Sequence, residues 1–142
     1  MKNITTDGLA PNACYIDDDG LIMIEIHGSY TLEADAPVEA AIQQAVDVLK
    51  AQGKPRRFLA DLRDMTGIDN SGMKSAFKGS KNDGLDRLAY VGTDDAAFKN
   101  IIELVVKILD KNRIRYFEDI ESARKWLLLP IPADGTINIQ KK

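Results

Sequence analysis

The sequence has one histidine, His27, and one cysteine, Cys14, so it lacks most of the residues from which metal sites and nucleophilic triads are built. A single cysteine excludes an intrachain disulfide, and no Cys/His spacing matches a zinc site. There is no phosphate-binding glycine loop and no dinucleotide fingerprint. We therefore expect no cofactor and no metal, and nothing in the sequence indicates an enzyme.

Long apolar runs and blocks of like charge are also missing. The N-terminal stretch MKNITTDGLAPNA has no apolar core of a signal peptide, and no later run approaches the length that spans a bilayer. The net charge is only −3, and the longest basic run inside the body is Arg56-Arg57. These absences argue against a nucleic-acid partner and against membrane insertion, and we expect a cytoplasmic protein.

What is present fits one folded domain. The 142 residues are 44% apolar and 29% charged, which is ordinary for a globular protein and argues against disorder. We predict a single domain over residues 1–142. Its parts would be a loose N-terminal arm at 1–11, a core at 12–129 and a tail at 130–142.

The hydrophobic period changes along the chain and predicts the order β-β-α-β-α-β-α-β-α. Asp18-Asp19-Gly20 is a hairpin signal between the first two strands. Gly53 and Pro55 end the first helix. The predicted strands lie at 13–17, 21–27, 57–62, 87–92 and 113–118, and the predicted helices at 33–51, 71–78, 96–110 and 119–129.

Strands separated by helices are joined by parallel crossovers. We therefore predict an α/β fold with a mixed, mostly parallel sheet of about five strands and four helices. The N-terminal β-hairpin should supply an antiparallel edge.

The helix predicted at 96–110 has more apolar surface than contact with one sheet requires. It could be buried between the sheet and the C-terminal segment LLLPIP, form a homodimer surface, or line a cavity for a small apolar ligand. Taken by itself, Trp126 is interpreted as a core residue. The residues that would form this apolar surface or cavity are Phe98, Ile101, Ile102, Val105, Val106, Leu109 and Trp126.

Residues 61–73, DLRDMTGIDNSGM, carry the most informative motif. They resemble the phosphorylation-site signature of the STAS domains, the family of anti-sigma factor antagonists and of sulphate-transporter cytoplasmic domains. That signature is a strand ending Asp-Leu-Ser, a short turn, and Ile-Asp-Ser-Ser-Gly-Leu opening a helix, and the match needs no gap. The resemblance implies a STAS fold, and it implies that Ser71 is phosphorylated by a partner anti-sigma kinase.

The motif departs from the signature at two positions, where Asn70 and Arg63 each replace a serine. Ser71 itself has two interpretations. It is either a phosphoacceptor or, with Asp69, a helix N-cap. A phosphate would add about −1.5 to −2 charges at the helix start and change which partner binds. The residues expected to form the partner-binding switch loop around Ser71 are Asp61, Arg63, Asp64, Asp69, Asn70 and Gly72.

A second resemblance covers residues 87–127, RLAYVGTDDAAFKNIIELVVKILDKNRIRYFEDIESARKWL. This stretch is similar to the stand-alone bacterial branch described as SpoIIAA-like, whose members have poorly defined functions. That branch is also compared with lipid-carrying CRAL-TRIO domains. Together the two resemblances span residues 13–129.

Three functional hypotheses follow from the residues and the resemblances. The first is a non-enzymatic regulatory module that binds an anti-sigma factor or a kinase-like protein and is switched at Ser71. The second is a carrier or sensor of a small apolar, lipid-like ligand in a cavity walled by the 96–110 helix. The third is a structural homodimer that uses the same apolar helix.

Overall fold

The computed structural model describes residues 10–68, 85–92, 99–100, 103, 107 and 113–131. Five strands and two complete helices lie within these ranges. The elements are β1 (Ala13–Ile16), β2 (Leu21–Tyr30), α1 (Leu32–Ala51), β3 (Arg57–Ile68), β4 (Arg87–Val91), β5 (Ile114–Phe117) and α4 (Ile120–Leu127).

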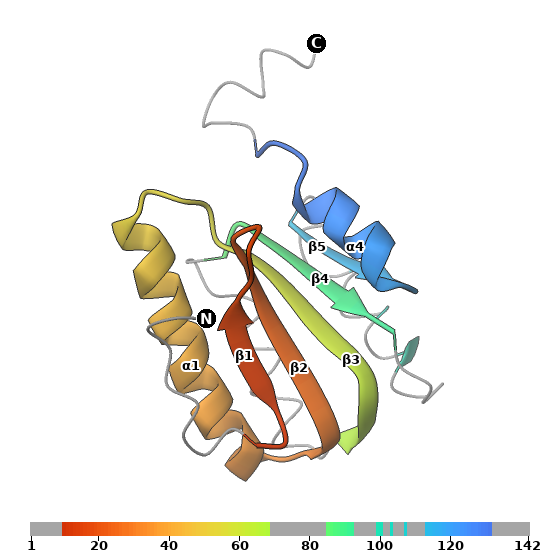
Figure 1. Ribbon diagram of the computed structural model, residues 1–142. Helices are drawn as coiled ribbons and strands as arrows, with labels where there is room; N and C mark the ends of the chain where they lie inside the picture. The colour runs from red at the N-terminus through yellow and green to blue at the C-terminus, as the bar shows by residue number, and fades with distance from the viewer. Residues whose placement is uncertain are drawn as a thin grey trace.

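The strands form one sheet in the order β1-β2-β3-β4-β5 (Figure 1). β1 pairs antiparallel with β2, and every other neighbouring pair is parallel. Figure 1 shows α1 at the β1 side of the sheet and α4 at the β5 side. The predicted mixed sheet with an antiparallel hairpin at one edge is therefore confirmed.

The hairpin turn is held by the side chain of Asp17. Its Oδ1 accepts hydrogen bonds from the backbone N–H groups of Asp19 and Leu21, both at 2.9 Å. Gly20 adopts a φ of 82°, which a residue with a Cβ rarely takes. The turn predicted from the sequence is thus stabilised by the side chain of Asp17 and by the left-handed conformation of Gly20.

Helix α1 begins and ends with local hydrogen-bonding motifs. Thr31 is the N-cap, and its Oγ1 accepts from the Ala34 N–H at 3.2 Å. At the other end Gly53 has a φ of 68°, and the N–H of Lys54 donates to the Leu49 carbonyl at 2.9 Å, as in a Schellman motif. These features explain why the helix stops where the glycine was expected to stop it.

The core has two parts because the sheet is covered on both faces. Ile22, Ile24 and Ile26 of β2 pack in the cluster under α1, and Leu21 and Met23 pack in the cluster under α4. This alternation is the period of two expected of a strand. The α4 cluster also contains Leu59, Ala89, Val91, Ala123, Trp126 and Leu127.

Strand β3 is longer than the strand predicted at 57–62, and residues 64–67, which align with the short turn of the STAS signature, belong to the strand instead. β3 continues to Ile68 because β2 also extends, to Tyr30, and the two extensions pair through His27↔Asp64 and Tyr30↔Ile68. The pairing register shifts twice, between Glu25 and His27 and between Gly28 and Ser29. Such bulges depend on the partner strand, and local turn propensity did not reveal them.

Of the four predicted helices, the described residues contain two complete ones, α1 and α4. The helix predicted at 71–78 and most of the one at 96–110 lie outside the described residues, although Lys99, Asn100, Glu103 and Lys107 are helical. Most of the predicted N-terminal arm and C-terminal tail also lies outside the described residues. Within the described part of the chain, neither helix is long and apolar enough to cross a membrane.

Candidate functional site

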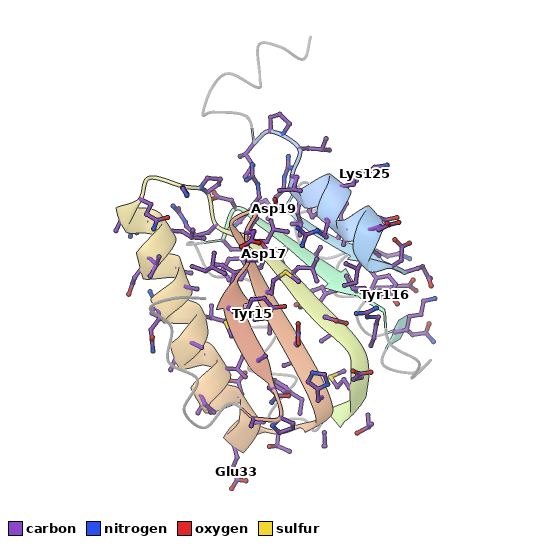
Figure 2. All side chains as sticks on the ribbon, viewed as in Figure 1. Tyr15, Asp17, Asp19, Glu33, Tyr116 and Lys125 are labelled. Atoms are coloured by element: carbon purple, nitrogen blue, oxygen red, sulfur yellow. The ribbon has the colours of Figure 1, made fainter. Side chains whose placement is uncertain are left out.

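A cluster of polar side chains lies on β1, β2 and β3, on the sheet face that also carries α4. We call it the β2–β3 polar cluster and define it as Tyr15, Glu25, His27, Asp61, Arg63 and Asp64. Glu25 and His27 alternate with Ile24 and Ile26, whose side chains point to the opposite face under α1. Figure 2 shows Tyr15 on β1, below the hairpin turn that Asp17 and Asp19 form beside α4.

The centre of the cluster is the pair of Asp61 and Arg63. The Oδ1 atom of Asp61 accepts from the backbone N–H of Arg63 at 3.1 Å and from its Nε at 2.9 Å. Oδ2 accepts from Nη2 at 2.8 Å, so the guanidinium is bound through two parallel bonds. The side chain of Asp61 is 16% exposed and that of Arg63 is 56% exposed.

This pairing shifts both ionisation equilibria. Partial burial alone would raise the pKa of Asp61, but the hydrogen bonds and charge of Arg63 outweigh burial and hold that pKa below its usual value. The hydrogen bond to Asp61 raises the pKa of Arg63. Both groups therefore stay charged at neutral pH, and their charges largely cancel each other.

Arg63 also packs against the end of β4. A Cβ placed on Gly92, whose φ is 44°, would lie 3.1 Å from Cγ of Arg63. The N–H of Gly92 donates to the Phe117 carbonyl at 2.9 Å, which fixes this glycine beside β5. The stem of Arg63 therefore lies across the end of β4.

His27 lies between two carboxylates. Its Nδ1 is 3.1 Å from Oδ2 of Asp64, and its Nε2 is 3.8 Å from Oε1 of Glu25. The sequence offered His27 no partner of informative spacing, because β3 was expected to end before Asp64. Only the extended pairing of β2 with β3 brings the imidazole and that carboxylate together.

Tyr15 ties the hairpin to the cluster. Its hydroxyl donates to Oε2 of Glu25 at 2.7 Å across the antiparallel pair. Burial, followed by this hydrogen bond and by the charges of Glu25, Asp17 and Asp61, raises the pKa of Tyr15 to about 12. Tyr15 therefore remains a hydrogen-bond donor over the physiological range.

The predicted site residues are only partly covered by the structure. Asp61, Arg63 and Asp64 lie together on β3, and so in a strand rather than in the loop that was expected there. Asp69, Asn70, Ser71 and Gly72 lie outside the described residues.

Of the residues predicted to form the apolar surface, the structure describes only Trp126. Trp126 is 8% exposed and packs with its ring centroid 5.6 Å from that of Phe117. The other residues of that surface, Phe98, Ile101, Ile102, Val105, Val106 and Leu109, lie outside the described residues. The carrier and homodimer hypotheses depend on them and stay predictions.

The β2–β3 polar cluster is suited to contact with another polar surface. The side chains of Arg63 and Asp64 are 56% and 70% exposed, so both are accessible to another surface. Among the residues that the structure describes, no group of three or more His, Cys, Asp or Glu could hold a metal ion.

Comparison with protein families places most of the chain in one family model. The family model described as SpoIIAA-like matches residues 21–128. This range includes α1, α4 and four of the five strands, and omits β1. No curated protein sequence matches the chain.

Solved structures share the fold, among them the following two. An anti-sigma factor antagonist, SpoIIAA in its unphosphorylated form, superposes with a TM-score of 0.55 at 13% sequence identity and covers 80% of this chain and 94% of its own. An uncharacterized protein of the DUF3478 family from Shewanella loihica PV-4, with a SpoIIAA-like fold, gives a TM-score of 0.50 at 16% identity and covers 82% and 91%. At these identities the likeness shows the fold alone.

Proposed function

The chain belongs to the SpoIIAA-like family, and from this membership we propose that it is a non-enzymatic regulatory module that binds a protein partner. The partner would be an anti-sigma factor or a kinase-like protein. Phosphorylation of Ser71 would switch the interaction. The solved anti-sigma factor antagonist of the same fold supports this choice, since its structure is that of an unphosphorylated form.

The observation that carries the proposal is the arrangement of β3. This strand presents Asp61, Arg63 and Asp64 in an ordered, partly exposed cluster, and its last residue, Ile68, lies three positions before Ser71 in the sequence. The described half of the motif is thus a strand that pairs with β2 as far as Ile68 and can support a recognition surface. Support of this kind lowers the entropic cost of binding.

A phosphate on Ser71 would change the charge of this surface. It adds about −1.5 to −2 charges near neutral pH. Asp61 already occupies the guanidinium of Arg63 through two bonds, so the new charge would meet the carboxylates of the cluster largely uncompensated. An acidic partner surface would then bind less tightly, by tenfold for about each 1.4 kcal/mol of repulsion.

The test is the intact mass of the protein purified from its native host under denaturing conditions. We expect an added mass of roughly 80 Da, one phosphate, in the wild type. The adduct should disappear in Ser71→Ala and persist in Ser75→Ala, the matched control at a neighbouring serine of the same segment. A bare mass in the wild type under all growth conditions, or an adduct that persists in Ser71→Ala, would overturn the phosphorylation switch.

A further inference from the structure

Strand β3 extends beyond its neighbour β4. It pairs with β4 only from Arg57 to Asp61, the last pair being Asp61↔Val91, whereas it pairs with β2 as far as Ile68. Figure 1 shows β4 ending beside β3 while β3 continues along β2. Within the residues that the structure describes, no strand lies beside residues 64–67 on the side away from β2. We call the main chain of residues 64–67 on this side the open β3 edge.

The two outer sides of this two-stranded ribbon are treated differently. On the β2 side, the backbone N–H of His27 donates to Oδ1 of Asn12 at 2.8 Å, so a side chain from the segment before β1 covers the strand. On the β3 side, the pairing with β2 provides the only main-chain hydrogen bonds of residues 64–67 within the described part of the chain. Unpaired N–H and C=O groups in a row are what an added strand binds.

Gly67 indicates that the open β3 edge is accessible. Its φ is not left-handed, and a Cβ placed on it would meet no heavy atom within 4 Å. Neither the conformation nor the packing of this chain therefore requires glycine at this position. A glycine inside a strand often marks a place where another backbone approaches closely. Thr66, the preceding residue, is also exposed.

The ribbon is supported from the α1 side. Tyr30 and Met65 are 6% and 5% exposed and pack in the cluster under α1. The hydroxyl of Tyr30 also donates to Oδ1 of Asp35, in the first part of α1. A two-stranded ribbon is marginally stable alone, and these contacts supply the support that it needs. The open β3 edge is therefore formed before a partner binds, which lowers the cost of binding.

The charges beside the edge limit what kind of segment fits. The β2–β3 polar cluster holds three carboxylates and one guanidinium, and Asp61 already binds that guanidinium through two bonds. Asp64, with a side chain that is 70% exposed, lies on the edge itself, and Glu25 adds a further negative charge beside His27. This surface favours a segment that carries basic side chains.

We propose that the open β3 edge binds an extended, basic segment of a protein partner as an added strand. The main chain of residues 64–67 supplies the hydrogen bonds, and Asp64 binds a cation of the segment. The inference rests on the partner binding proposed above, but not on phosphorylation of Ser71. Toward such a segment a phosphate on Ser71 would be attractive, the opposite of its effect on an acidic surface.

The experiment uses the full, unphosphorylated chain and a short synthetic peptide of alternating lysine and valine, since valine favours the extended conformation. One control peptide has N-methylated central residues and cannot pair through its main chain. A second has glutamate in place of each lysine. The variant Thr66→Lys places a charge at the edge, which hinders strand addition. Ser29→Lys is the matched control, because Ser29 is exposed and pairs with Gly67 from the other strand of the ribbon.

The readouts are peptide affinity and the hydrogen exchange of backbone amides measured by NMR. We expect the lysine–valine peptide to slow exchange at those amides of residues 64–67 that face away from β2. Its affinity should fall about tenfold in Thr66→Lys and stay unchanged in Ser29→Lys and in Ser71→Ala. The exchange measurement on the wild type tests the edge even if Thr66→Lys does not fold.

Four results would overturn the proposal: no binding, equal binding of the N-methylated peptide, tighter binding of the glutamate peptide, or equal affinity in Thr66→Lys and the wild type. Protection of residues 64–67 that rises with protein concentration in the absence of peptide would also overturn it and assign the edge to a second copy of the chain. Any of these results leaves a phosphate found on Ser71 in place. An unphosphorylated Ser71 in the native host, with peptide binding intact, would overturn the switch and leave the added strand.

Discussion

Arginine side chains have different roles at the two ends of the parallel strands. At the strand starts, Arg87 is partly buried and donates to three carbonyls of the α4 C-terminus. Toward the strand ends, Arg63 is 56% exposed and binds a carboxylate two residues away on its own strand. Arg87, at the strand starts, therefore holds α4 in place. Arg63, toward the strand ends, is exposed and paired with a neighbouring carboxylate. Arg87 is therefore part of the architecture, whereas we expect that Arg63 can be changed with little effect on the fold.

The largest expected effect on stability comes from Trp126, whose ring contacts both Arg87 and Arg115 near the strand starts. Trp126→Ala should lower the free energy of unfolding by about 3–5 kcal/mol, because it opens a cavity under α4 and removes the platform of two arginines. The measurement is urea unfolding followed by circular dichroism. Trp126→Phe, which keeps an aromatic ring, should lose much less, and equal losses in both variants would contradict the expectation that an aromatic ring supplies this stability.

A matched pair of arginine variants compares the two ends directly. Arg87→Met should cost about 2–3 kcal/mol, since three carbonyls lose a charged donor. Arg63→Met should cost about 0.5–1 kcal/mol, as expected for an exposed pair. Urea unfolding of both variants provides the comparison. If the two losses are equal or in the reverse order, Arg87 and Arg63 do not have the different structural roles that the account assigns to them.

The link between the hairpin turn and α4 should be weaker than the Arg87 cap. Arg124 lies 2.7 Å from Asp17 through Nη1 and also binds Asp19. Arg124→Gln should cost about 1 kcal/mol, and the loss should shrink at high salt. Asp18→Asn, at the exposed residue between these carboxylates, is the control and should change the melting temperature little. Equal shifts in the two variants would argue that the hairpin is not held by this contact.

The smallest effect is a pKa change at the strand ends. Arg63→Gln should raise the pKa of Asp61 toward its usual value, because the bonds that lower it are lost. In the wild type the pKa is depressed in the folded state, so Asp61 adds stability above the unfolded pKa of about 3.9 and loses it as the pH falls through the lower folded value. Titration of the Asp61 carboxyl by NMR measures both variants, and an unchanged pKa would contradict the account.

The sequence predicted those features that depend on neighbours along the chain. The hairpin at Asp17–Gly20 and the end of α1 at Gly53 follow from local turn and cap chemistry. The strand predicted at 21–27 is present as the first part of β2, and its apolar residues are buried on both faces. The two resemblances, at residues 61–73 and 87–127, also led to the right family.

Features that depend on pairing between distant segments were missed. The extension of β3 beyond Leu62, and with it the contact of His27 with Asp64, exists only because β2 extends alongside it. The gathering of arginines at the strand starts was missed for a similar reason. Arg57, Arg87 and Arg115 appear scattered in the sequence, and parallel strand order brings them to one edge.

The central claim is that Ser71 regulates a surface at the strand ends without altering the rest of the fold. The most direct test is to incorporate phosphoserine at position 71 during synthesis and to compare backbone-amide NMR spectra and melting temperatures with those of the unmodified chain. The account predicts that among the described residues the shifts are confined to 27–30 and 61–68, with the melting temperature nearly unchanged. Shifts that spread to Arg87 and Arg115 at the strand starts, a general loss of dispersion, or an unchanged spectrum would contradict it.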